Sequence, residues 1–285
     1  MHSLVAIERW PGRHAVAVVA RTPGGTAVTA SLGALDAPFA YASVTKVVTT
    51  LAILAEVGAG GCALEDEVGP PGATLAHLLA HASGLPLDGT SPVAAPGTRR
   101  IYSNVGIELA ADHAARHAGT SVPAMLHANV LEPLGMVRTT LEGTAAAGLV
   151  GPTVELSALA AELVDPTLVD PALAARARAV QFPGLAGVLP GFGRQDPCDW
   201  GLGLEVKGTK HPHWTGTTWP PWTFGHFGQA GGFVVVDASV GLAIVTLGDE
   251  AFGPWSTASW PGLTDDVRAE ALAKAPAHDG AERAT

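Results

Sequence analysis

Ser43 and Lys46, in the segment Tyr41-Ala-Ser-Val-Thr-Lys46, have the residue types and spacing that nucleophilic catalysis requires. A serine hydroxyl is a weak nucleophile at neutral pH and needs a neighbouring base. An amine three residues later lies on the same face of a helix and can act as that base. The chain has four lysines and a single Ser-x-x-Lys. The alternative is a serine at a helix start, followed by a lysine whose amine extends to solvent.

Tyr102 and Asn104 form a second pair, in Tyr102-Ser-Asn104. The chain has only two tyrosines and two asparagines, so their occurrence together is unusual. Alone, the pair is typical of a loop tyrosine beside a turn asparagine. Its position after the Ser-x-x-Lys favours a shared function, because two weak motifs in a fixed order carry more information than either alone.

Two histidine pairs, His77/His81 and His113/His117, have the i, i+4 spacing that metal sites use on helices. Neither pair belongs to a His-Glu-x-x-His motif, and no carboxylate ligand pattern lies nearby in the sequence. We therefore expect these histidines to lie at the surface or to be hydrogen-bonded in the core. The sequence predicts no metal and no cofactor.

Composition narrows the possible partners. The 285 residues are 47% apolar, enough for a large core, and the net charge is -10. No basic cluster is longer than Arg99-Arg100, so we expect neither nucleic acid nor an anionic membrane as a partner. A small-molecule substrate fits better. The two cysteines, Cys62 and Cys198, are expected to be buried thiols, and the oligomeric state is left open.

The first residues lack the features of an export signal. Glu8 and Pro11 interrupt the apolar stretch that such a signal needs. Nowhere do about eighteen apolar residues follow one another, as a membrane-spanning helix requires. From these features we expect a cytoplasmic protein.

The elements that must position these residues follow from the hydrophobic pattern. Residues 15–20 and 26–32 are β-prone runs around a Pro-Gly-Gly turn, which predicts a hairpin. Residues 43–56 are apolar on most sides and predict a buried helix with Ser43 in its first turn. Further helices are expected at 74–81, 107–117 and 122–134, strands at 201–206, 224–229, 232–237 and 241–247, a helix at 264–274 and a frayed tail at 275–285.

Strands at both ends of the chain are expected to join in one sheet. The predicted division is a sheet lobe of residues 1–60 and 196–285 and a helical lobe of residues 61–195, with the active site in the cleft between them. The segments 182–200 and 211–223 are long loops of the kind that line functional sites. The loop 210–216 either forms a wall of the cleft or packs beneath neighbouring tryptophans.

Ser43-x-x-Lys46, Tyr102-Ser-Asn104 and His226-Phe-Gly228 occur in an order that resembles the penicillin-binding-protein and serine β-lactamase superfamily. The likeness is strongest to the class C β-lactamases and their esterase relatives. The resemblance extends over residues 16–247, and four further stretches carry it: 78–85, 96–104, 131–136 and 224–232. It implies an α+β fold, a mainly antiparallel sheet flanked by helices with an inserted all-helical lobe.

The resemblance also implies roles for these residues. Ser43 would attack a carbonyl carbon to form an acyl-enzyme, and Lys46 could act as base only if its pKa were lowered by burial and by the helix N-terminus. Tyr102 would share the proton transfers, and the sequence leaves open which of the two is the base. Asn104 would orient Lys46 and hydrogen-bond the substrate.

The third motif would form the substrate-binding edge of the site. The backbone N–H groups of Ser43 and Gln229 would stabilise the oxyanion, and Gly228 would let substrate approach the strand. His226 and Phe227 stand where the family commonly has lysine and threonine, which weakens binding of a substrate carboxylate. We therefore expect hydrolysis of a small-molecule ester or amide. The alternatives are a β-lactamase or D-Ala peptidase acting on a lactam or peptide, and a non-catalytic binding module.

Overall fold

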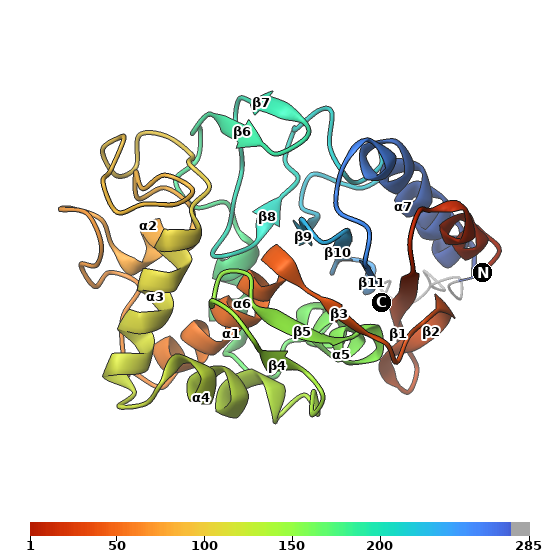
Figure 1. The fold of residues 1–285 in the computed structure, drawn as a ribbon, viewed down its shortest axis with the longest axis horizontal. Helices are drawn as coiled ribbons and strands as arrows, with labels where there is room; N and C mark the ends of the chain where they lie inside the picture. The colour runs from red at the N-terminus through yellow and green to blue at the C-terminus, as the bar shows by residue number, and fades with distance from the viewer. Residues whose placement is uncertain (275–285) are drawn as a thin grey trace, which may run out of the picture.

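The computed structural model describes residues 1–274, which form a six-stranded antiparallel sheet with helices on both faces (Figure 1). The strand order is β2-β1-β11-β10-β9-β8. These strands are β1 (His14–Thr22), β2 (Gly25–Gly33), β8 (Glu205–Val206), β9 (Phe224–Gly228), β10 (Gly232–Asp237) and β11 (Leu242–Gly248). The N-terminal hairpin therefore pairs with the last strand, as expected, with Val18 opposite Ile244.

Side chains along β1 alternate between two apolar cores. Ala15, Ala17 and Val19 belong to one core, while Val16 and Val18 belong to the other. This alternation follows from the two-residue period of a strand. Both faces of the sheet must therefore be covered.

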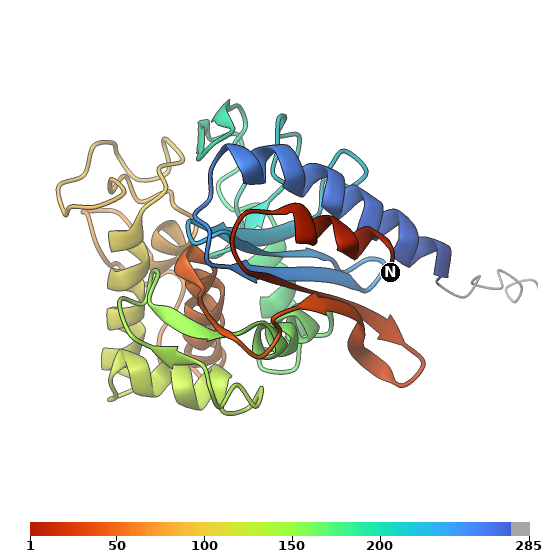
Figure 2. The same cartoon turned by 45° about the vertical axis from the view of Figure 1, so that its right-hand side comes forward.

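Helices supply that cover. On one face lie the C-terminal helix α7 (Pro254–Lys274) and a 3-10 helix (Ser3–Arg9), while α5 (Thr153–Val164) lies on the other (Figure 2). α7 begins ten residues before the expected helix at 264–274. The frayed tail expected at residues 275–285 lies outside the described residues.

The helix α1 (Thr45–Gly58) is the buried helix that the sequence predicts, and all its residues from Thr45 to Leu54 are buried. A short 3-10 turn (Ala42–Val44) precedes it and contains Ser43. Burial of α1 on most sides fixes its axis, and so fixes where Ser43 and Lys46 lie relative to the sheet.

The remaining elements are α3 (Asn104–His117), which is as long as α1, and several shorter helices and strands. The shorter helices are α2 (Leu75–Leu79), α4 (Val122–Leu126), which continues as a π-helix (His127–Leu131), and α6 (Pro171–Arg178). The strands are β3 (Pro38–Ala40), β4 (Thr140–Leu141), β5 (Leu149–Pro152), β6 (Gly187–Leu189) and β7 (Gly193–Gln195). The sequence pattern missed all five, because two to four residues are too few for a period to appear.

The α+β fold class is confirmed, with a mainly antiparallel sheet and flanking helices. The division into a sheet lobe and a helical lobe stays a prediction. One helix of the predicted helical lobe of residues 61–195, α5, packs on β1 and β11 of the large sheet. Cys62 and Cys198 are buried free thiols, as expected. Within the described part of the chain, no helix is both long and apolar enough to cross a membrane.

Candidate active site

Ser43 lies in a strained turn that packs against β9. The residue before it, Ala42, has a φ of 44°, in the left-handed region that residues with a Cβ rarely adopt. A Cβ on Gly228 would lie 2.5 Å from the Tyr41 carbonyl oxygen and 3.2 Å from the Ser43 nitrogen. Glycine is therefore needed here so that β9 can contact the turn that contains Ser43. The sequence interpretation assigned Gly228 only to making room for substrate.

The Lys46 amine is fully buried and lies 3.2 Å from Ser43 Oγ. Its Nζ also lies 2.8 Å from Asn104 Oδ1 and 2.9 Å from the Ala146 carbonyl oxygen. Both of these oxygens are acceptors, so a neutral amine would donate its two N–H bonds to them and direct its lone pair at Ser43. A lysine extending to solvent is excluded by this geometry.

Burial lowers the pKa of Lys46 to about 7, although the negative charges of Glu108 and Asp88 act in the opposite direction. Loss of hydration disfavours the ammonium form when no carboxylate contacts it. A large fraction of Lys46 is therefore neutral at physiological pH, as a general base must be.

Asn104 is held from both sides at the first residue of α3. Its Oδ1 accepts a hydrogen bond from Lys46, and its Nδ2 donates to Asp88 Oδ1 at 3.2 Å, which fixes the orientation of the amide. The preceding residue, Ser103, caps the helix by accepting a hydrogen bond from the Gly106 N–H at 3.0 Å. The cap fixes the start of α3 and with it the amide that positions Lys46.

Tyr102 and His226 meet in the same site. His226 Nδ1 lies 2.7 Å from the Phe227 carbonyl oxygen, which can only accept, so Nδ1 carries the proton. Nε2 is then an acceptor, and the Tyr102 hydroxyl, 3.3 Å away, donates to it. Burial, together with the charge of Lys46, lowers the pKa of His226 to about 3. Burial raises the pKa of Tyr102, so the phenol is protonated.

His81 and Trp200 support Tyr102, and the sequence interpretation did not assign either of them to the site. His81 is buried with φ at 54°, and its Nδ1 accepts the Ser103 N–H at 3.2 Å. Its ring lies 4.5 Å from the Tyr102 ring and 4.7 Å from Trp200, between ring centroids. Trp200 in turn lies 5.4 Å from His226. These contacts join residues far apart in sequence, so no local pattern indicates them.

In the loop 210–216, His213 and Trp214 are buried while His211 and Pro212 are exposed, which favours packing for the two buried side chains. His213 Nε2 lies 2.9 Å and Lys210 Nζ 3.2 Å from Glu205 Oε1, and Trp214 donates to the same carboxylate. Burial alone would raise the pKa of Glu205, but Lys210 and His213 hold it at about 2. This cluster ties the loop to β8, next to the strand that carries His226.

Gln229 follows β9 directly and is exposed. A cavity of about 400 Å³ lies beside Tyr102. Its wall is mainly apolar and includes Leu87, Ile101 and Val188, with Arg99 and Arg194 among its polar residues. The site thus combines a buried amine, a serine hydroxyl and an adjoining apolar space.

An antiparallel sheet with Ser-x-x-Lys at a buried helix start defines the serine β-lactamase and penicillin-binding-protein class of fold. A sequence model described as Beta-lactamase matches residues 8–267, and the chain therefore belongs to the β-lactamase family. No match was found among curated proteins.

Solved structures agree with this assignment. A β-lactamase from Mycobacterium bovis is 44% identical, with a TM-score of 0.91 over 94% of this chain and 98% of that one. Simvastatin synthase from Aspergillus terreus is 16% identical, with a TM-score of 0.75 over 95% of this chain and 96% of that one. A β-lactamase/D-alanine carboxypeptidase from Yersinia pestis is 18% identical, with a TM-score of 0.70 over 95% of this chain and 98% of that one. The last two show the shared fold alone.

Proposed function

We propose that this protein is a serine hydrolase that forms an acyl-enzyme on Ser43 and hydrolyses a small-molecule ester or amide. The observation that carries the proposal is the Lys46 amine, buried and 3.2 Å from Ser43 Oγ, with carbonyl oxygens accepting from its other side. An amine held this way cannot turn away from the hydroxyl. Its lowered pKa allows it to accept the Ser43 proton near neutral pH.

In the first step, the Ser43 Oγ attacks the carbonyl carbon while its proton moves to Lys46 Nζ. The carbonyl oxygen becomes an oxyanion, which the backbone N–H groups of Ser43 and Gln229 would stabilise. Gly228 supports this arrangement because it lets β9, which ends just before Gln229, lie against the Ser43 turn. Collapse of the tetrahedral intermediate leaves an ester on Ser43, and water attack on that ester restores the hydroxyl.

Tyr102 would protonate the leaving group. Its raised pKa keeps the phenol protonated, so it suits the role of acid better than the role of base. Lys46 would then pass the proton that it took from Ser43 to the phenolate oxygen, which leaves Lys46 neutral and Tyr102 protonated again. Lys46, with the lowered pKa, is the stronger candidate for the base, and Asn104 holds it in place.

The substrate class follows from His226 and the adjoining cavity. A neutral imidazole that presents an acceptor to the site attracts no carboxylate. The cavity of about 400 Å³ beside Tyr102 has a mainly apolar wall, which suits an apolar acyl or alcohol group, and its arginines lie among apolar residues. We therefore favour esters and amides over β-lactams and D-Ala peptides as substrates. The favoured substrates carry no carboxylate next to the reacting carbonyl.

Hydrolysis of β-lactams is the second candidate. The observation that favours it is the 44% identical protein from Mycobacterium bovis, which is described as a β-lactamase. The two candidates share the acyl-enzyme step and differ in what binds beside His226. A binding module that keeps the fold without catalysis is the remaining alternative.

A parallel activity panel tests the proposal. Wild type, Ser43→Ala and the exposed-site control Ser91→Ala would be assayed with p-nitrophenyl esters, a chromogenic cephalosporin and a D-Ala-D-Ala peptide. We expect ester turnover by wild type and by the control and none above background by Ser43→Ala. A fluorophosphonate probe with peptide mass spectrometry should place the adduct on Ser43. No turnover of any substrate and no adduct would contradict a hydrolase.

A further inference from the structure

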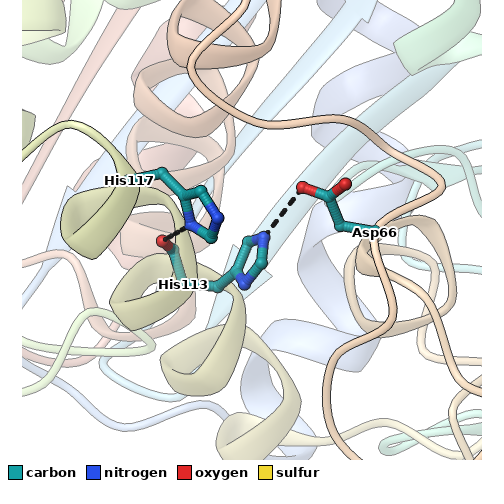
Figure 3. Close-up of side chains that lie close together, drawn as sticks. All are labelled: Asp66, His113 and His117. Atoms are coloured by element: carbon teal, nitrogen blue, oxygen red, sulfur yellow. Dashed lines mark hydrogen bonds and ion pairs between the residues drawn. The ribbon is translucent and has the colours of Figure 1, made fainter.

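Asp66, His113 and His117 converge at a point that the proposed active site does not use (Figure 3). His113 and His117 lie one turn apart on α3, and Asp66 comes from the segment between α1 and α2. The histidine spacing was visible in the sequence without a carboxylate partner. The fold supplies that partner, because it brings Asp66 beside a histidine 47 residues further along the chain.

The three side chains are close enough to share one ion. His113 Nε2 lies 3.0 Å from Asp66 Oδ2, and one ligand atom from each residue lies within 4.8 Å of the other two. Zinc bonds of about 2.0–2.1 Å in a tetrahedral site place two ligand atoms about 3.3 Å apart. The Asp66–His113 separation is near that value. The ligand atom of the exposed His117 lies within 4.8 Å of the other two, so binding one tetrahedral ion requires that the three side chains move closer together.

The hydrogen bonds around the cluster already orient its ligands. His117 Nδ1 lies 2.9 Å from the His113 carbonyl oxygen, so Nδ1 carries the proton and the Nε2 lone pair is available. Asp66 Oδ2 accepts a hydrogen bond from the Ala63 N–H at 2.8 Å, which holds the carboxylate toward α3. Hydrogen bonds between backbone groups and ligand side chains are typical of metal sites.

We propose that Asp66, His113 and His117 bind a zinc ion, with water as the fourth ligand. Two imidazoles and one carboxylate suit Zn²⁺ and Co²⁺ better than Mg²⁺ or Ca²⁺, which require mostly oxygen ligands. On binding, the ion takes the place of the proton that His113 Nε2 donates to Asp66. The neutral imidazole then carries its proton on Nδ1 instead, so no proton need be lost from the ring.

The ion would join the C-terminal half of α3 to the segment that precedes α2. His113 lies nine residues after Asn104, which at 1.5 Å per residue is about 13 Å along the helix. Zinc at this distance contacts no reacting atom. Its effect would be on stability, because a ligand that binds only the folded chain raises the melting temperature.

Calorimetric titration of the tag-free, chelator-treated protein with Zn²⁺ tests the site. We expect one zinc per chain, a melting temperature that rises with zinc concentration, and at least tenfold weaker binding by His117→Gln, an exposed position that should fold normally. The matched control is His127→Gln, another exposed histidine, 3.8 Å from Glu132. It should bind zinc as wild type does.

Co²⁺ provides a second readout, because four-coordinate cobalt gives intense visible absorption bands. These bands should appear in wild type and in His127→Gln, and should be lost in His117→Gln and weakened in Asp66→Asn. The proposal fails if wild type shows no zinc binding at zinc concentrations up to about 100 μM, which would mean a Kd weaker than that value. It fails equally if His117→Gln binds as tightly as wild type. Neither result depends on whether the protein is a hydrolase.

Discussion

The Nε2 atom of His226 lies 3.3 Å from the Tyr102 hydroxyl and accepts its proton in a hydrogen bond, because Nδ1 is bonded to the Phe227 carbonyl oxygen. The imidazole is neutral, so this strand presents an acceptor to the site and not a cation. In the family pattern a lysine commonly stands here. In the proposed function, this exchange of a donor for an acceptor disfavours a substrate carboxylate, and it gives the Tyr102 hydroxyl an acceptor.

Replacement of Lys46 tests the proposed base. Lys46→Met keeps the side-chain length but removes the amine, so kcat/KM for a p-nitrophenyl ester should fall by about 10³-fold or more, within the range that loss of general base catalysis produces. Circular dichroism should show an unchanged fold. Activity within tenfold of wild type would contradict a role for Lys46 as base.

The pH dependence of kcat/KM should report the same group. Only neutral Lys46 can accept the Ser43 proton, and its pKa is lowered to about 7. The rate should therefore rise with pH, reach half of its plateau near pH 7 and level off about one unit above that. His226, with a pKa of about 3, should contribute no titration between pH 5 and 9. A profile that continues to rise toward pH 10 would show that Lys46 keeps an ordinary pKa.

His226 can be tested by a matched pair of substitutions. His226→Gln retains a side-chain oxygen that can accept from Tyr102, whereas His226→Leu removes the acceptor at similar volume. We expect kcat to fall less than about tenfold in His226→Gln and by about 10–100-fold in His226→Leu, because the lost hydrogen bond leaves the buried hydroxyl without that partner. Equal kcat values in the two variants would mean that the hydrogen bond to Tyr102 does not matter.

Gly228→Ala should damage both stability and activity. The added Cβ would lie 2.5 Å from the Tyr41 carbonyl oxygen, so the turn that carries Ser43 must shift. We expect a loss of about 1–3 kcal/mol in the free energy of unfolding, typical of overpacking, and at least tenfold lower kcat. The control is Gly24→Ala, where the nearest atom is 3.9 Å away. Urea unfolding and ester kinetics would measure both effects, and a fully active Gly228→Ala would contradict the close contact.

Stability should also depend on pH through Lys46. Its pKa is 10.5 in the unfolded chain and about 7 in the folded protein. Between these values the unfolded state binds a proton that the folded state does not, so the free energy of unfolding rises with pH by up to about 1.4 kcal/mol per unit. Below pH 7 and above pH 10.5 this contribution is flat.

Urea unfolding of wild type and Lys46→Met at pH 7 and pH 9 isolates this contribution, because other titrating groups are common to both proteins. The difference in unfolding free energy between wild type and the variant should shift in favour of wild type by about 2 kcal/mol over this range. A difference that stays constant would show that folding leaves the pKa of Lys46 unchanged.

The sequence by itself determined the fold class, the hairpin that opens the chain, the buried helix α1 and the family. These features depend on periods and spacings that act within a few residues of one another. Ser43 lies in the 3-10 turn that leads directly into α1, and Lys46 lies in the first turn of α1, so their proximity follows from local helical geometry. The strand that carries His226 was also visible, because β-prone runs separated by turn residues indicate a meander.

The tertiary structure alone decided what surrounds those residues. The Ala146 carbonyl that orients Lys46, the His81 ring beneath Tyr102 and the carboxylate beside His113 all come from distant parts of the chain. Gly228 packs against the Tyr41 turn for the same reason. No local pattern encodes such contacts, because they exist only after the helices pack on the sheet. Packing also buries Lys46 and thereby lowers its pKa, so the chemistry of the site depends on the folded structure.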